Sequence, residues 1–233
     1  YSLKKSIERK IMPSNTTKKS PNSRTATREV RRQQLIESTI DSISKRGFSG
    51  TTLATVTKGA KLSHGIINFY FKSKEVLYEE TLGYLAQEHY DLWLSGMKNA
   101  GPEPEKQLAA ILEADFNPAI CSKKKLAVWF AFWGQAKYRP NYLILHHAYD
   151  DHRNAELRRV CAELIEDGGY NHIDPDSIAR RIEAVVDGLW LNLLLYPNVQ
   201  HRMQARNDCF TYLSEVFSKH FPHISANNNR TQK

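Results

Sequence analysis

The fold is decided by the stretch Thr51–Leu77, TTLATVTKGAKLSHGIINFYFKSKEVL, which predicts two short helices followed by a longer one. Thr51 and Thr52 can cap the first short helix, because a hydroxyl at this position accepts a hydrogen bond from a backbone N–H. Ser63 can cap the second helix and Ser73 the third in the same way. About four residues join the two short helices, which is the spacing of a helix-turn-helix module.

Further helices are predicted on both sides of this module. From Arg28 the chain has helical spacing that places Leu35 and Ile43 on one face, and Gly47 is a typical helix stop. Later helical segments alternate with Gly- and Pro-rich breaks; in Asp174-Pro175 an N-cap precedes proline at the first helical position. No alternating pattern indicates a strand, so the sequence predicts an all-α chain of about nine helices.

The second short helix, expected over Ser63–Tyr70, is the candidate DNA reader. In a helix-turn-helix module this helix enters the major groove with its N-terminal residues toward the base edges. An Asn amide can pair with adenine, and a Phe ring can pack on a thymine methyl group. The alternative interpretation is an ordinary surface helix. Contacts to bases and phosphates are expected from Thr52, Ser63, His64, Gly65, Asn68, Phe69, Tyr70 and Lys74.

Positive charge is concentrated ahead of and within the module. Residues 1–34 hold ten Lys and Arg against two acids, and residues 35–78 hold six against three. Residues 79–233 hold seventeen against twenty. This asymmetry indicates a polyanion such as double-stranded DNA as the partner of the N-terminal third.

The domain organisation follows from these patterns. We expect a disordered basic arm over residues 1–27, a DNA-binding domain over 28–74, a ligand-binding and dimerisation domain over 75–221, and a disordered tail over 222–233. The arm either reaches the minor groove or is unstructured. Its basic, Ser/Thr-rich composition is also compatible with a transit peptide. A secretory signal is excluded, because the segment lacks the apolar core that such a signal needs.

Several protein classes are excluded by composition. The longest strongly apolar stretch, Leu189–Leu195, is too short to cross a bilayer. Three cysteines without paired spacing argue against a disulfide scaffold or a structural zinc site, and fit a reducing cytoplasm. We find no phosphate-binding glycine loop, no zinc-protease motif and no activated nucleophile, so we expect neither an enzyme nor a cofactor. His146, His147 and His152 do not complete a metal-ligand set, and no metal is expected.

The module closely resembles the DNA-binding signature of TetR-family repressors. The similarity rests on Thr51-Thr52-Leu53, on Gly59–Gly65 and on Phe69–Leu77. It implies a homodimer of nine-helix chains with an N-terminal DNA-reading part and a C-terminal ligand pocket. The sequence departs from the family at Lys61, where glycine is usual; a left-handed backbone there would cost roughly 1 kcal/mol, and the Lys61 side chain could reach a phosphate.

The rest of the chain is similar to BetI-type repressors, which sense choline and repress its oxidation to glycine betaine. The similarity is carried by Lys125–Trp133, Arg139-Pro140, Asp151-His152-Arg153 and Ile182–Leu191, and by Arg31–Glu37, which adds Arg31 to the expected DNA contacts. Choline-like control of glycine betaine synthesis is therefore expected. The alternative is a TetR-type regulator of efflux, pyrimidine or polyamine metabolism with another effector.

An aromatic cage for a quaternary amine is predicted in the C-terminal part. Trp129 and Trp133 are four residues apart and share a helix face, and Trp190 on another helix could close the cage. Aromatic faces hold a quaternary ammonium, which has no N–H to donate, and Asp150, Asp151 or Asp187 could compensate its charge. The alternatives are ordinary core aromatics and, for Asp151-His152-Arg153, a surface salt-bridge cluster. The expected ligand-binding residues are Trp129, Phe132, Trp133, Asp151 and Trp190.

The last two predicted helices carry apolar stripes at helical spacing. In TetR-type proteins such a pair meets its twin in a four-helix interface, which would set two reading helices against a near-palindromic operator. The alternative is that both stripes pack inside one chain. The expected dimer residues are Ile182, Val185, Leu189, Leu193, Phe210, Leu213 and Phe217.

Overall fold

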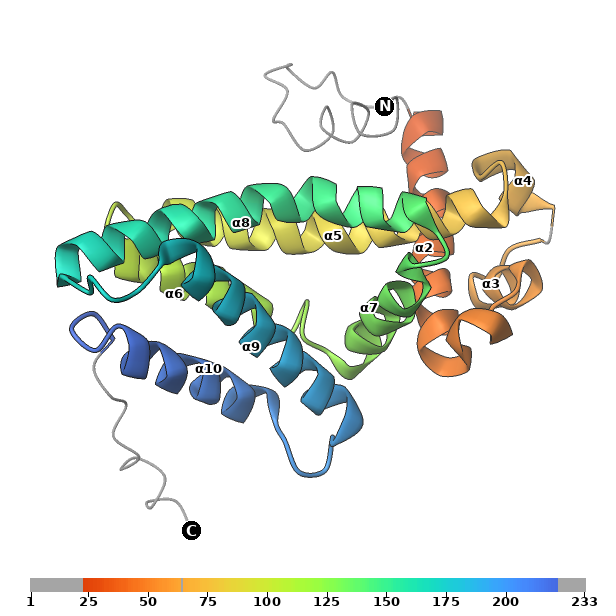
Figure 1. Ribbon diagram of the computed structural model, residues 1–233. Helices are drawn as coiled ribbons and strands as arrows, with labels where there is room; N and C mark the ends of the chain where they lie inside the picture. Colours follow the sequence, from red (N-terminus) through yellow and green to blue (C-terminus); the bar gives the residue numbers. More distant parts are fainter. Residues whose placement is uncertain (1–22, 64, 222–233) are drawn as a thin grey trace, which may run out of the picture. The chain divides into compact units, whose positions relative to one another are not determined.

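The computed structural model describes residues 23–63 and 65–221, and every regular element within these ranges is a helix (Figure 1). The nine helices of the described part are α2 (Ser23–Gly50), α3 (Leu53–Gly59), α4 (Ile66–Tyr70), α5 (Lys74–Asn99), α6 (Pro104–Asp115), α7 (Lys123–Ala136), α8 (Pro140–Gly168), α9 (Pro175–Leu195) and α10 (Arg202–Val216). The predicted all-α class is confirmed. No helix among these residues is long and apolar enough to span a membrane.

Contacts divide the chain into two compact units. The first unit comprises the chain up to Tyr90 together with Ser122–Asp151, and the second comprises Asp91–Cys121 together with the chain from His152 onward. Both α5 and α8 therefore contribute residues to each unit. The predicted domains are continuous segments named by function, whereas these units are groups of segments that contact one another. The predicted boundaries therefore stay a prediction.

The first unit is built around α2. The apolar face predicted for this helix is buried, with Leu35 and Ile43 in the core. On the same helix the Ser38 hydroxyl donates to the backbone carbonyl of Val56 in α3 at 2.7 Å. Helices α3 and α7 both pack against α2. This scaffold fixes α3 and the turn that follows it.

The predicted helix signals of the module are largely confirmed. Thr52 caps α3 by accepting from the backbone N–H of Thr55 at 3.1 Å, and the Thr55 hydroxyl accepts from the N–H of Thr52 at 2.9 Å. Thr51 does not cap, because its hydroxyl donates to the carbonyl of Gly47 at 2.9 Å. Gly47 has φ 70° and ends the regular part of α2. Ser73 caps α5, accepting from the backbone N–H three residues on at 3.2 Å.

Two helix starts correct the sequence prediction. Helix α2 begins at Ser23, five residues before the predicted start at Arg28. The disorder expected for the arm stays a prediction, and residues 1–22 and the tail over 222–233 lie outside the described residues. The costly step in helix formation is the first turn, and each residue added afterwards gains one hydrogen bond. A helix that is anchored by its apolar face can therefore continue beyond the last apolar residue. Ser63 does not cap α4. Its carbonyl accepts from the N–H of Ile66 at 3.1 Å in a tight turn, and Gly65 occupies the N-cap position without a side-chain bond.

Within the first unit, the early part of α8 lies beside α5. The Asn141 amide donates to the Glu79 carboxylate at 2.7 Å, and the Tyr149 hydroxyl donates to the Gln87 side chain at 3.1 Å. Both contacts advance along the two helices together, so α5 and α8 run in the same direction here. Helix α7, which precedes α8 in the chain, packs on α2.

The second unit is organised by α9 and α10, which pack against each other. Helix α9 begins as predicted: Asp174 accepts from the N–H of Ser177 at 2.6 Å, and Pro175 is the first helical residue. Ile182 of α9 and Leu213 of α10 are fully buried in this core.

A buried ion pair also lies in the second unit. Arg153 of α8 is 5% exposed and donates to the carboxylate of Asp115, which is 1% exposed, at 2.6 Å. Arg153 also donates to Glu183 of α9. The surface salt-bridge cluster predicted for Asp151-His152-Arg153 is therefore wrong for Arg153, whose partners are on two other helices. Asp151 itself is exposed.

Candidate DNA-binding face and effector site

The outer face of α4 is the candidate DNA-binding face. Ile67 is buried and anchors this short helix, while Asn68 and Phe69 are exposed. Phe69 shows 67% of its surface to solvent. A Cβ added at Gly65 would meet no atom within 4 Å, so the start of the helix is open to an approaching partner.

The turn before α4 has the geometry expected from the sequence. Lys61 adopts φ 55°, the only left-handed backbone among the non-glycine residues that the structure describes. The N–H of Lys61 donates to the carbonyl of Lys58 at 3.2 Å, and the N–H of Leu62 donates to the carbonyl of Thr57 at 2.9 Å. These bonds hold the turn although a side chain stands where glycine would be unstrained. The Lys61 side chain is exposed and available to a phosphate.

The other predicted DNA contacts are accessible to different degrees. The Lys74 ammonium lies 5.1 Å from the centre of the Tyr78 ring, at the start of α5. Arg31 is exposed on α2 and donates to the side chain of Gln34 at 3.0 Å. His64 lies outside the described residues. Thr52 and Ser63 are exposed, and Tyr70 is half-buried.

Arg28 is a residue of this region that sequence reasoning missed. It is exposed near the start of α2, and its guanidinium carbon lies 5.6 Å from the centre of the Phe69 ring. Nothing in the sequence pairs these two residues, because they lie far apart in the chain and on different helices. The contact is produced by the packing of the module.

In the first unit, α7 and α8 bring together an aromatic group that we call the tryptophan cluster: Trp129, Phe130, Trp133 and His146. The two indoles have ring centres 6.3 Å apart, and the His146 ring lies 5.7 Å from Trp133 and 6.5 Å from Trp129. His146 also pairs with the Asp150 carboxylate. The indole Nε1 of Trp133 is buried and donates to no acceptor among the described residues. The cluster and the adjoining Asp150 thus combine aromatic faces, a carboxylate and an indole donor without an acceptor among the described residues.

Phe132, on the same helix, faces a different group. Its ring lies 5.3 Å from Phe48 and 5.2 Å from Tyr142, in edge-to-face contacts. Burial raises the pKa of the Tyr142 phenol to about 12. This aromatic core gives Phe132 a packing role apart from any ligand.

The remaining predicted ligand residues have separate surroundings. Trp190 belongs to the second unit, where its buried indole donates to the backbone carbonyl of Asp115 at 3.1 Å. The donor of Trp190 is thereby used in packing α9 against the end of α6. Asp151 is an exposed residue of α8 at the edge of the first unit.

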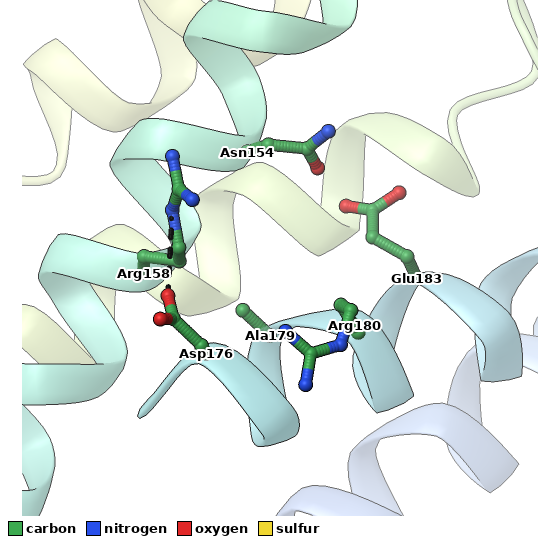
Figure 2. Close-up of a pocket in the computed structure, with 6 residues that line it drawn as sticks. All are labelled: Asn154, Arg158, Asp176, Ala179, Arg180 and Glu183. Atoms are coloured by element: carbon green, nitrogen blue, oxygen red, sulfur yellow. Dashed lines mark ion pairs between the residues drawn. The ribbon is translucent and has the colours of Figure 1, made fainter. Parts of the chain in front are cut away.

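The second unit also has an open cavity of about 350 Å³ between α8 and α9 (Figure 2). An ion pair crosses it, with Arg158 of α8 and Asp176 of α9 3.7 Å apart. The lining contains no aromatic side chain, so this cavity lacks the faces that hold a quaternary ammonium. Its residues are Asn154, Arg158, Asp176, Ala179, Arg180 and Glu183.

The residues predicted for a dimer interface are unequally accessible. Most are buried within the single chain: Ile182, Leu193, Phe210, Leu213 and Phe217. Val185 and Leu189 are half-buried. Sequence reasoning missed a group of exposed apolar residues late in α9 and just beyond it, namely Leu191, Leu195, Tyr196, Val199 and Met203.

Comparison with known proteins decides the family. A model of the bacterial regulatory proteins of the tetR family matches residues 35–81, and a model of the BetI-type transcriptional repressor C-terminal region matches residues 104–218. The HTH-type transcriptional regulator BetI of Paraburkholderia phymatum is 35% identical over 171 residues, covering 70% of this chain and 81% of that protein. BetI of Paraburkholderia xenovorans is 32% identical over 168 residues, covering 70% and 82%.

The chain belongs to the TetR family, with a BetI-type C-terminal region. The fold agrees with this assignment. A transcriptional regulator from Pseudomonas aeruginosa PAO1 superposes with a TM-score of 0.71 at 26% identity, covering 83% of this chain and 94% of that one. A regulator from Saccharomonospora viridis, solved in complex with choline, gives 0.69 at 18% identity, covering 80% and 96%; at this identity it shows the fold alone. This TetR-family protein is therefore a transcriptional regulator with a helix-turn-helix module.

Proposed function

We propose that this TetR-family regulator represses transcription by inserting α4 into the major groove of an operator. The exposed Asn68 and Phe69 would face bases, and the exposed Lys61 would meet a phosphate. Arg31, Thr52, Ser63, His64, Gly65, Tyr70 and Lys74 complete the proposed contacts. The single observation that carries the proposal is the exposed outer face of α4, anchored by the buried Ile67 within a region of positive charge.

We further propose that a small quaternary amine such as choline releases the repressor. The support is the tryptophan cluster, the BetI-type similarity and the choline complex of the Saccharomonospora viridis regulator. Trp129 and Trp133 would hold the ammonium, and the buried Nε1 of Trp133 could donate to the ligand's hydroxyl oxygen. Asp150, beside His146, would compensate the positive charge. Phe132, Asp151 and Trp190 stay proposed ligand contacts, with less support than Trp129 and Trp133. Phe132 packs against Phe48 and Tyr142, Trp190 belongs to the second unit, and Asp151 is exposed.

The release would act through α5. This helix starts at Lys74, shortly after α4 in the chain, is capped by Ser73 and contributes residues to both units, so a shift in it can move α4. A ligand that prefers the non-binding state by about 1–3 kcal/mol weakens operator binding about 5–150-fold. The biological consequence would be control of glycine betaine synthesis in the cytoplasm, with no enzymatic activity of the protein itself.

We propose a homodimer through α9 and α10. Val185 and Leu189 are only half-buried in the single chain, and Leu191 and Leu195 nearby on α9 are exposed. A second copy would cover this apolar surface, and two α4 helices would then meet two half-sites. The predicted dimer residues that are buried in the single chain would pack behind this surface and hold α9 and α10 together.

The test uses a labelled duplex that the protein selects from a random-sequence pool. Choline and betaine aldehyde are titrated against the complex, alongside 3,3-dimethylbutan-1-ol, in which a carbon replaces the charged nitrogen. We expect choline, but not its neutral isostere, to weaken DNA binding. Trp133→Leu should abolish the choline effect, whereas Tyr138→Leu, at an exposed aromatic just beyond α7, should keep it.

Each result decides a separate claim. If neither cation changes the affinity, the effector proposal fails and DNA binding stands, which favours a regulator of another pathway. An isostere as potent as choline would show an apolar pocket and contradict the cation cage. Failure to select any duplex would contradict DNA binding by this protein.

A further inference from the structure

Arg28 and Phe69 form an exposed cation–π contact between two helices of the module. Arg28 lies near the start of α2, Phe69 lies on α4, and the guanidinium carbon is 5.6 Å from the ring centre. This distance lies within the range of about 6 Å at which a cation is attracted to an aromatic face. Both side chains are exposed, so the contact has not formed by burial of either residue in the core.

The Phe69 ring is restrained from a second direction. Tyr70 meets it edge-on, with ring centres 5.1 Å apart and an angle of 83° between the planes. A side chain that is already held in place loses less conformational entropy when it binds a partner. Phe69 is therefore an exposed ring with a defined orientation.

We propose that Arg28 and Phe69 act together as a thymine-reading pair. The ring of Phe69 packs on the 5-methyl group of one thymine in the major groove, and the guanidinium of Arg28 binds a phosphate close to that base. The pair rests on the proposed DNA binding of α4 and adds a specificity determinant from α2. It defines one operator position by a methyl group instead of a hydrogen bond.

The chemistry of the two side chains selects this partner. Phe carries no hydrogen-bonding group, so it cannot read the donor and acceptor pattern of a base edge. Thymine is the one DNA base that presents a methyl group in the major groove. The contact with Phe69 engages the guanidinium through the ring face and leaves its N–H donors able to bind a phosphate.

The charges around the pair favour DNA over another protein as the partner. Exposed cations flank α4 on both sides in the chain, with Lys58 and Lys61 before it and Lys72 after it. Helix α4 itself, Ile66–Tyr70, contains no acidic residue. An apolar ring in such surroundings suits a surface that combines negative charge with methyl groups, as the major groove does.

A deoxyuridine scan tests the pair. Each thymine of the selected duplex is replaced in turn by deoxyuridine, which differs only by the missing methyl group, and the affinity is measured for each duplex. For the unaltered protein we expect one position in each half-site to lose affinity by about fourfold, the value of one buried methyl group.

Two variants and a control assign the effect. Phe69→Ala should remove the discrimination at that position. Arg28→Met should reduce it below about twofold and lower the slope of log affinity against log salt by about one for each half-site. Lys45→Met removes an exposed charge from the other end of α2 and should keep the fourfold discrimination.

The outcomes separate this inference from the proposed function. Binding of a selected duplex with no thymine-sensitive position, or full discrimination by the Arg28→Met variant, would overturn the pair and leave DNA binding intact. A protein that selects no duplex at all would instead contradict the DNA binding on which the pair rests.

Discussion

Arg153 and Asp115 form an ion pair of 2.6 Å inside the second unit, and both side chains are almost completely removed from solvent. Glu183 joins the pair from α9, so three helices are connected through one guanidinium. Removing one partner of a buried pair leaves an uncompensated charge, which costs far more than the pair contributes. The pair therefore determines how α6, α8 and α9 assemble.

Arg153→Met should lower the free energy of unfolding by about 3–5 kcal/mol, because the buried Asp115 carboxylate would lose the guanidinium that faces it at 2.6 Å. Arg158→Met is the matched control on the same helix, since Arg158 makes a solvent-exposed ion pair at 3.7 Å. Its effect should be below about 1 kcal/mol. Urea unfolding followed by circular dichroism compares the two; equal effects would contradict the structural role of Arg153.

Gly59→Ala should destabilise the module, because a Cβ at this position would overlap the Ser38 Oγ. Overpacking of this kind costs about 1–3 kcal/mol. Ser38→Ala removes the obstacle and gives up the 2.7 Å bond to the Val56 carbonyl. In a double-mutant cycle, the Ser38→Ala/Gly59→Ala protein should be more stable than the two single effects predict; simple additivity would rule out the overlap.

Lys61→Gly should stabilise the fold by up to about 1 kcal/mol, because glycine adopts the left-handed backbone at φ 55° without steric cost. Lys58→Gly, in the last turn of α3, removes the same charge from ordinary helix and should destabilise by about 1 kcal/mol. Thermal melts of both variants provide the comparison. A loss of stability in the Lys61 variant would show that this turn carries no strain.

The cysteines should be inert in the folded protein. Burial raises the pKa of the thiols of Cys121, Cys161 and Cys209 to about 12, from a usual value near 9. At pH 8, Ellman's reagent should react with none of them quickly, and with all three after unfolding in urea. A thiol that reacts in the native protein at the rate of free cysteine would contradict the burial.

The same shifts predict a dependence of stability on alkaline pH. Because the folded protein binds these protons more tightly than the unfolded chain, their contribution is fully present below pH 9 and is lost as the pH rises toward 12. A variant with all three cysteines replaced by alanine should lose less stability between pH 9 and 11. Identical pH profiles for the two proteins would show that the thiols do not contribute to the pH dependence of stability.

Local signals in the sequence predicted much of the module. The caps at Thr52 and Ser73, the stop at Gly47 and the left-handed Lys61 are confirmed, since each depends on the residue and its near neighbours. Ser63 does not make the predicted cap, because the turn after Lys61 carries the chain past it before α4 begins.

Contacts between distant residues could not be predicted in this way. The polar local sequence of Arg153 predicts a surface position, because its partner Asp115 lies on another helix and local sequence does not reveal it. The sequence offers His146 only as a candidate metal ligand, whereas the packing of α8 on α7 places its ring against Trp133. The Arg28–Phe69 contact is likewise a product of tertiary packing.

The central claim is that the exposed face of α4 recognises duplex DNA by sequence. The most direct measurement is the affinity of the protein and of its Asn68→Ala variant for the selected duplex and for a scrambled one, over a range of salt concentrations. The unaltered protein should prefer the selected duplex by at least about 10³-fold, and its affinity should fall steeply with salt. Asn68→Ala should lose at least about tenfold of that preference. Equal affinity for both duplexes, or an unchanged preference in the Asn68→Ala variant, would contradict the central claim.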